Sequence, residues 1–196
     1  MPNYTLKRIA RYEEEVRKSR FLAIASRVKN SRAALAWIER HSVAEASHNC
    51  WAYQIGDEYR FYDDGEPGGT AGRPILQAIQ GQNYDQVVVL VIRWFGGTKL
   101  GTGGLIRAYG GVAAQCLRAA DKQRLVARET LQCHCPFPEM SRVQSGFPGL
   151  GIHIQSEEFD EQGVQWQLSI PQAQKQRFME QFLNQTRGQG LVHELD

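Results

Sequence analysis

Hydrophobic side chains along the first part of the chain follow the spacing of strands and helices in turn. Residues 86–92 (QVVVLVI) are almost all apolar and mostly β-branched, which is typical of a central strand covered on both faces. Residues 21–25 form a shorter apolar run between charged segments and predict another strand. Leu35 and Ile38 share the buried side of a helix predicted over residues 31–46, with Ser31 as its N-terminal cap.

Two aromatic-rich runs, residues 50–55 and 58–62, flank Gly56-Asp57 and predict a β-hairpin. Its aromatic side chains would suit stacking on nucleobases, but alternating aromatics on a hairpin are more often core residues. Two further helices are predicted, over about residues 70–79 and 105–122. The second has apolar residues on more than one side, so we expect it to be mostly buried.

The last third of the chain has the order strand, helix, strand, strand, helix, strand. Alternating apolar positions mark two of these strands, at Leu131, Cys133, Cys135 and at Val164, Trp166, Leu168, Ile170. This order predicts a ferredoxin-like βαββαβ domain. The sequence therefore predicts an α+β protein with two domains, residues 1–128 and 129–196.

The sign of the charge changes at the same boundary. Residues 1–128 hold 19 lysines and arginines against 12 aspartates and glutamates, a net charge of +7, whereas residues 129–196 hold 4 against 9, a net charge of −5. A basic and an acidic domain favour different partners, and nucleic acid is a candidate partner for the basic one.

Composition narrows the class of protein. Hydrophobic residues make up 42% and charged residues 22%, as in globular proteins with a real core. Apolar runs stay far below the roughly 20 residues of a membrane-spanning helix, and the N-terminus lacks the apolar core of a signal peptide. We therefore expect a cytoplasmic protein without a membrane partner. Metal and disulfide sites are not expected from the spacing of the four cysteines, so we predict buried thiols and no cofactor; they are Cys50, Cys116, Cys133 and Cys135.

Two glycine-rich segments bracket the central strand at residues 86–92. The first is acidic, and its charged residues are Asp63, Asp64, Glu66 and, at its end, Arg73. The second is basic, and its charged residues are Arg93, Lys99 and Arg107. If the strand carries both segments to one edge of a sheet, they face each other there.

The basic segment enters its helix through Gly101, Gly103 and Gly104. A glycine loop at a helix start directs unpaired backbone N–H groups and the positive end of the helix dipole at whatever lies above. Arg107, placed in the first helical turn, opposes that dipole, which indicates a compensating anion. The sequence thus predicts an anion-binding surface suited to phosphate or nucleic acid, formed by these glycines with Arg73, Arg93, Lys99 and Arg107.

Known nucleotide fingerprints do not fit this segment. Residues 97–102 lack the Gly-Lys-Ser/Thr ending of a P-loop. Ile106 stands where a dinucleotide fingerprint has its third glycine. A structural ion network between the acidic and basic segments is an equally good interpretation, and it is compatible with an anion site.

A catalytic interpretation is the minority one. Asp63, Asp64 or Glu66 would act as acid, base or Mg²⁺ ligand on a phosphorylated or nucleotide substrate. His48 lies near Cys50, but an i, i+2 pair on a strand is typical of packed neighbours. No Ser-His-Asp order, nucleophile elbow or HExxH motif supports catalysis, so no catalytic residue is assigned and a non-enzymatic role is favoured.

Four motifs give the chain a specific resemblance to the YigZ/IMPACT family. They are KSxF at 18–21, ASHxCxAY at 46–53, DDGEPxGTAGRP at 63–74 and RxFGGxKLGxGGLxRAY at 93–109. Three positions depart from the usual pattern: Gly68 replaces a common serine, Trp94 a usual tyrosine and Thr98 a common aliphatic residue. The missing hydroxyl at position 68 weakens any idea of a serine nucleophile there.

The resemblance implies a fold for each domain and a role in translation. It implies an N-terminal domain similar to domain 2 of ribosomal protein S5, and a C-terminal domain similar to the last domain of a translocation elongation factor. The resemblance implies that eukaryotic relatives bind a ribosome-associated activator of an amino-acid-starvation kinase, and so modulate translation initiation, partly through a further N-terminal domain. The motifs above do not include that domain, so this partner is not carried over. We expect a cytosolic factor that contacts RNA, the ribosome or a ribosome-associated protein; the alternative is the small-molecule enzyme described above.

Overall fold

The computed structural model describes residues 4–194. The chain divides into two compact units, the first ending at Leu125 and the second beginning at Val126. The division falls three residues before the boundary predicted from sequence. Arg128 belongs to the second unit, because its guanidinium donates to the Ser169 hydroxyl at 2.8 Å and to the Gly151 carbonyl at 2.6 Å.

A five-stranded antiparallel sheet forms the centre of the first unit. In sheet order its strands are β2 (Ala10–Val16), β3 (Ser19–Arg27), β6 (Val87–Trp94), β4 (His48–Ile55) and β5 (Glu58–Tyr62). A separate antiparallel ribbon pairs β1 (Tyr4–Leu6) with β7 (Lys122–Arg124), so the two ends of the unit meet. The predicted hairpin is β4–β5, and the predicted central strand is β6.

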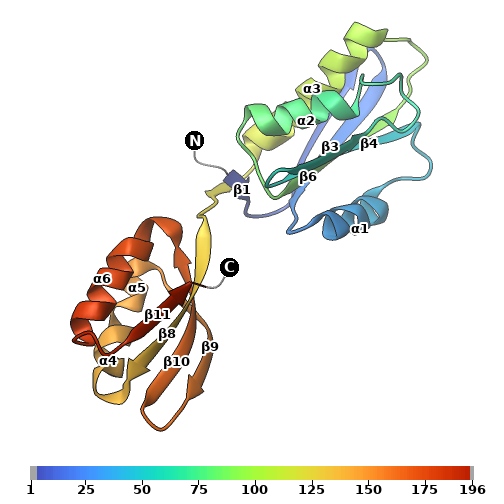
Figure 1. Cartoon of the computed structure of the whole chain (residues 1–196). Helices are drawn as coiled ribbons and strands as arrows, with labels where there is room; N and C mark the ends of the chain where they lie inside the picture. Colours follow the sequence, from blue (N-terminus) through green and yellow to red (C-terminus); the bar gives the residue numbers. More distant parts are fainter. Residues whose placement is uncertain (1–3, 195–196) are drawn as a thin grey trace. The chain divides into compact units, whose positions relative to one another are not determined.

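Helices cover the sheet on both faces (Figure 1). One face packs against α2 (Gly72–Gly81) and α3 (Thr102–Ala119), and the other against α1 (Ser31–His41). Successive residues of β6 alternate between these two layers: Val89 and Val91 lie in the core under α2 and α3, and Leu90 and Ile92 in the core under α1. Such a strand must be apolar throughout, as residues 86–92 predicted.

Two helix starts differ from their predictions. Asn30, not Ser31, caps α1, because its side-chain oxygen accepts the Ala33 N–H at 2.8 Å. The helix ends at His41, and Leu35 lies on its exposed side. Helix α3 begins at Thr102, three residues earlier than predicted, because Gly101 takes a positive φ of 72° that ends the loop there.

The second unit has the predicted ferredoxin-like order. Its sheet runs β11-β8-β10-β9, all antiparallel, with β8 (Arg128–Pro136), β9 (His153–Phe159), β10 (Gly163–Pro171) and β11 (Leu191–Glu194). Its core packs one sheet face against α4 (Phe137–Ser145), α5 (Phe147–Leu150) and α6 (Lys175–Gln185); a short 3₁₀ helix, η1 (Gln172–Gln174), precedes α6. Cys133 and Cys135 share the buried face, where burial raises their pKa values to about 12 and about 11.

Within residues 4–194, no helix has the length and apolar character needed to cross a membrane.

Candidate functional site

The acidic and basic segments meet through one buried carboxylate. Glu66 Oε1 accepts a hydrogen bond from Arg93 Nη1 at 2.6 Å and another from the Tyr109 hydroxyl at 2.7 Å. The Glu66 and Arg93 side chains are only 4% and 5% exposed. The two segments do face each other at one edge of the sheet, and the contact between them is an internal ion pair. Arg93 is therefore unavailable as a surface anion contact.

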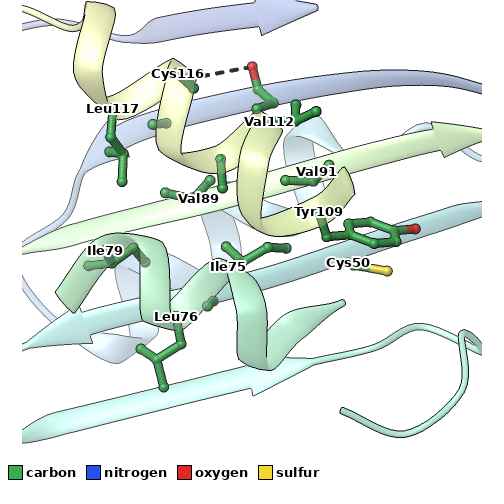
Figure 2. Packing of buried hydrophobic residues seen from close by; sticks show 14 of the residues in the cluster. Cys50, Ile75, Leu76, Ile79, Val89, Val91, Tyr109, Val112, Cys116 and Leu117 are labelled. Atoms are coloured by element: carbon green, nitrogen blue, oxygen red, sulfur yellow. Dashed lines mark hydrogen bonds between the residues drawn. The ribbon is translucent and has the colours of Figure 1, made fainter. Parts of the chain in front are cut away.

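Two buried groups beside this pair, Cys50 and Tyr109, stay protonated. Tyr109 reaches from α3 toward Cys50 on β4, at the end of the core beneath the two segments (Figure 2). Desolvation raises the pKa of both groups well above their ordinary values. The Cys50 thiol donates to the Asp63 carbonyl at 3.0 Å, so it serves as a packed donor and not as a thiolate nucleophile.

His48 also supports the acidic segment. Its Nδ1 lies 2.8 Å from the Asp64 carbonyl, and its Nε2 lies 3.7 Å from Glu66 Oε1. His48 and Cys50 thus each bond a different residue of the segment and not each other, as expected for neighbours on one strand. Together with Arg93 and Tyr109, they hold Glu66 and its segment against the sheet.

The two aspartates of the acidic segment accept hydrogen bonds from the backbone. Asp63 Oδ1 accepts the Ala71 and Gly72 N–H groups at 3.0 and 2.8 Å, and its Oδ2 accepts Gly69 N–H at 2.8 Å. Asp63 therefore satisfies the N-terminus of α2. The Asp64 carboxylate accepts the Asn49 N–H. Each carboxylate of the segment has a structural role.

Two serines fix the start of the basic segment. Ser47 Oγ accepts the Phe95 N–H at 2.9 Å, and Ser19 Oγ accepts the Gly96 N–H at 3.3 Å. Gly96 lies directly on the β2–β3 turn, since a Cβ at that position would stand 1.8 Å from the Lys18 carbonyl oxygen. Only glycine permits this approach, and it fixes the basic segment beside residues 17–18.

The start of α3 contrasts with the start of α2. Within residues 4–194, no side chain caps its first N–H groups, and Gly101 supplies the N-cap. Arg107 lies in the second turn, not the first as predicted, but its Nη1 would be 3.6 Å from a Cβ at Gly103. Helical side chains lean toward the N-terminus, so the guanidinium returns over the first turn.

The remaining predicted cations are at the surface. Arg73, Lys99 and Arg107 are exposed, and in the described part of the chain none of them forms an ion pair. Of the aromatic residues in the hairpin, Trp51 and Tyr53 are core residues, whereas Tyr59, Phe61 and Tyr62 are exposed.

Sequence reasoning missed three parts of this arrangement. Tyr109 was recognised only as an apolar position of α3, and Ser19 and Ser47 only as members of motifs. Nothing in their spacing shows that they bond residues far away in the sequence. The turn at Arg17 and Lys18 was missed as well, because it lacks the usual Asn-Gly signal.

Comparison with known proteins places the chain in a family. A family model described as the Impact N-terminal domain matches residues 17–117, which is more than half of the chain. An IMPACT family member from Thermus thermophilus is 48% identical over 159 residues, covering 80% of this chain and 86% of that protein. The chain belongs to the IMPACT family. Two other IMPACT family members are similar to it: one from Haemophilus influenzae, 32% identical over 94% of this chain and 93% of its own, and YigZ of Escherichia coli K12, 35% identical over 67% and 68%.

The second unit of this IMPACT family member also matches a family model, a domain of unknown function (DUF1949), over residues 133–189. A crystal structure of a hypothetical protein superimposes with a TM-score of 0.75 at 28% identity, and it covers 100% of this chain and 98% of that one. The two-domain fold is thus shared with a solved structure. Many residues that carried the family resemblance, among them Ser19, Ser47, His48, Asp63 and Arg93, are those that hold the two segments together.

Proposed function

We propose that this IMPACT family member is a cytosolic factor that contacts RNA, on the ribosome or elsewhere in the translation machinery, without catalysing a reaction. Its contact surface, called the α3 surface below, consists of Lys99, the backbone of residues 101–104 and Arg107, with Arg73 at the start of α2. Phosphate groups of an RNA backbone are the ligands that such a surface suits.

The uncapped start of α3 is the observation that carries the proposal. Asp63 satisfies the N-terminus of α2, but among the residues that the structure describes no side chain caps α3. Arg107 lies over this first turn, and an adjacent phosphate would accept from both its guanidinium and the backbone. Residues 1–125 carry 18 lysines and arginines against 12 acidic residues, a net charge of +6 that attracts a polyanion.

The contacts of the acidic segment favour a binding role for the protein over a catalytic one. Glu66 is paired with Arg93, Asp63 with three backbone donors and Asp64 with one. Acid–base or metal chemistry would require a carboxylate free to meet a substrate. The described cysteines are all buried free thiols, which suits a reducing compartment such as the cytosol.

A salt titration tests the proposal. Binding of a fluorescently labelled 12-nucleotide single-stranded RNA should weaken linearly in log K against log salt. The variant Lys99→Ala/Arg107→Ala should bind more weakly at every salt concentration. The slope of log K against log salt should be shallower by roughly 1.4, because the variant loses two cations and each phosphate contact on a single strand contributes about 0.7.

The matched control removes two cations from the other face of the sheet. Arg32 and Arg40 are exposed on α1, so Arg32→Ala/Arg40→Ala changes the net charge equally. The control should retain most of the affinity and the original slope. Absence of binding at 20 mM salt, or an equal loss in both double variants, would overturn the proposal.

A further inference from the structure

A surface groove of about 350 Å³ lies between β2 and α3, next to the α3 surface. One side is formed by Glu14 and Val16 of β2 and by Arg17 after it, and the other by Leu100, which precedes α3, and by Arg107 and Ala108 of α3. Gly104 and Gly111 of α3 also line the groove. Arg107 thus belongs both to this groove and to the α3 surface.

Two arginines approach the groove from opposite sides. Arg17 and Arg107 are exposed and, within the described residues, neither forms an ion pair. The apolar side chains of Val16, Leu100 and Ala108 line the same groove. Two unpaired guanidinium groups beside apolar lining residues suit a ligand that is anionic at one end and flat and apolar at the other.

The turn that presents Arg17 is strained. Arg17 and Lys18 have φ values of 48° and 68°, so two successive residues with long side chains take left-handed conformations. Asn-Gly is the usual pair for such a turn, and non-glycine residues there cost on the order of 1 kcal/mol each. Retained strain of this kind points to a use for the side chains, and Gly96 holds the turn in place from the other side.

We propose that this groove seats a single nucleotide of the bound RNA strand, an inference that rests on the function proposed above. The phosphate lies between Arg17 and Arg107, and the base lies on Leu100 and Ala108. Glu14 accepts from an exocyclic amino group of the base and repels a second phosphate. The volume is near the lower limit of about 300 Å³ for small-ligand sites, which suits one nucleotide and excludes a duplex.

A variant that fills the groove without changing its charge tests this. Gly111 is exposed within α3, and a Cβ there would meet no atom within 4 Å, so Gly111→Leu should fold and should raise helix stability. We expect it to weaken binding of the 12-nucleotide RNA at least fivefold with an unchanged salt slope. Gly111→Ala should weaken binding much less, and Gly149→Leu, an added leucine in the second unit with equal free space, should have no effect.

A second variant relieves the strained turn. Arg17→Asn/Lys18→Gly should raise the melting temperature of the first unit and at the same time weaken RNA binding at least fivefold, so loss of binding cannot be attributed to misfolding. If this variant binds RNA as tightly as the wild type does, the groove is not a binding site.

The ligand class is tested with small probes in the full chain. Adenosine monophosphate should shift the backbone amide NMR signals of residues 104, 108 and 111, whereas inorganic phosphate should shift mainly those of residues 102–104. If both probes shift the same amide signals equally, the groove recognises only the phosphate group, and the nucleotide assignment is overturned. If Gly111→Leu binds RNA normally while Lys99→Ala/Arg107→Ala does not, the groove inference fails and the proposed function stands; if the wild type binds no RNA, both fail.

Discussion

Glu66 is the residue through which the two glycine-rich segments hold each other in place. It is buried and accepts hydrogen bonds from Arg93 and Tyr109. Glu66→Gln would leave the Arg93 guanidinium buried without its counter-charge, which typically costs about 3–5 kcal/mol. Tyr109→Phe removes a single hydrogen bond to a charged group, typically about 1.5–3 kcal/mol. Urea unfolding of the first unit should rank the two variants in this order.

Glu39 provides the control for that series. It is exposed on α1 and forms no ion pair in the described structure, so Glu39→Gln should change the unfolding free energy by less than about 0.5 kcal/mol. If Glu66→Gln were no more destabilising than Glu39→Gln, the buried pair would not be what holds the segments.

At the residue scale, the sequence indicated which charged residues lie in the two segments but not which of them form an ion pair. Charges in the two loops were visible, and a structural ion network was one of the interpretations. The sequence did not show that Arg93 would be buried while Lys99 and Arg107 stayed exposed. Which cation pairs with Glu66 depends on where β6 ends relative to that carboxylate. Arg93 lies 27 residues from Glu66 in the sequence, so tertiary packing, and not local spacing, sets their contact.

At the element scale, the loops depend on glycines for different physical reasons, and a three-variant series separates them. Gly68→Ala should be nearly neutral, because the position is open and its φ is ordinary. Gly97→Ala should cost about 1 kcal/mol, because φ is 84° although space is free. Gly96→Ala should cost at least about 2 kcal/mol, because its Cβ would overlap the Lys18 carbonyl.

Thermal unfolding of the three variants gives the comparison, with the Phe95 and Lys18 amide NMR signals as a local reporter. A cost for Gly96→Ala no larger than that for Gly97→Ala would mean that the basic segment does not pack on the β2–β3 turn as described.

Strong hydrophobic periodicity identified several strands. Strand β6 is buried almost throughout, and β8 and β10 have alternating buried positions, so they were recognised. The exposed strands β5 and β9 were predicted without such a pattern. Strand β2 reads ARYEEEV and lies at the edge of its sheet. Ala10, Tyr12 and Val16 pack partly against the core, but three consecutive glutamates interrupt the apolar alternation, so the strand was missed. The start of α3 was placed too late because Gly103 and Gly104 have low helix propensity, which tertiary packing overrides.

At the scale of the whole molecule, the two units have separate cores and opposite charge. Every residue in the two buried clusters of the first unit lies between positions 4 and 120, and every residue in the cluster of the second unit lies between 131 and 192. The first unit carries +6, and residues 126–196 carry 5 lysines and arginines against 9 acidic residues, a net charge of −4. Separate cores predict that each unit folds by itself, and the positive charge of the first unit suits the RNA contact proposed for it.

Division of the chain after Leu125 tests both statements. A fragment of residues 1–125 keeps β7 paired with β1 and the Lys7 N–H bonded to the Asp121 carbonyl at 2.9 Å, so it should fold cooperatively. It should bind the 12-nucleotide RNA at least as tightly as the full chain does at low salt, because the acidic unit no longer reduces the net charge. A fragment of residues 1–120 lacks β7 and should be measurably less stable. The division would be contradicted if fragment 1–125 failed to fold. It would also be contradicted if the fragment folded but lost the RNA binding that the full chain shows, because the first unit would then need the second unit in order to bind.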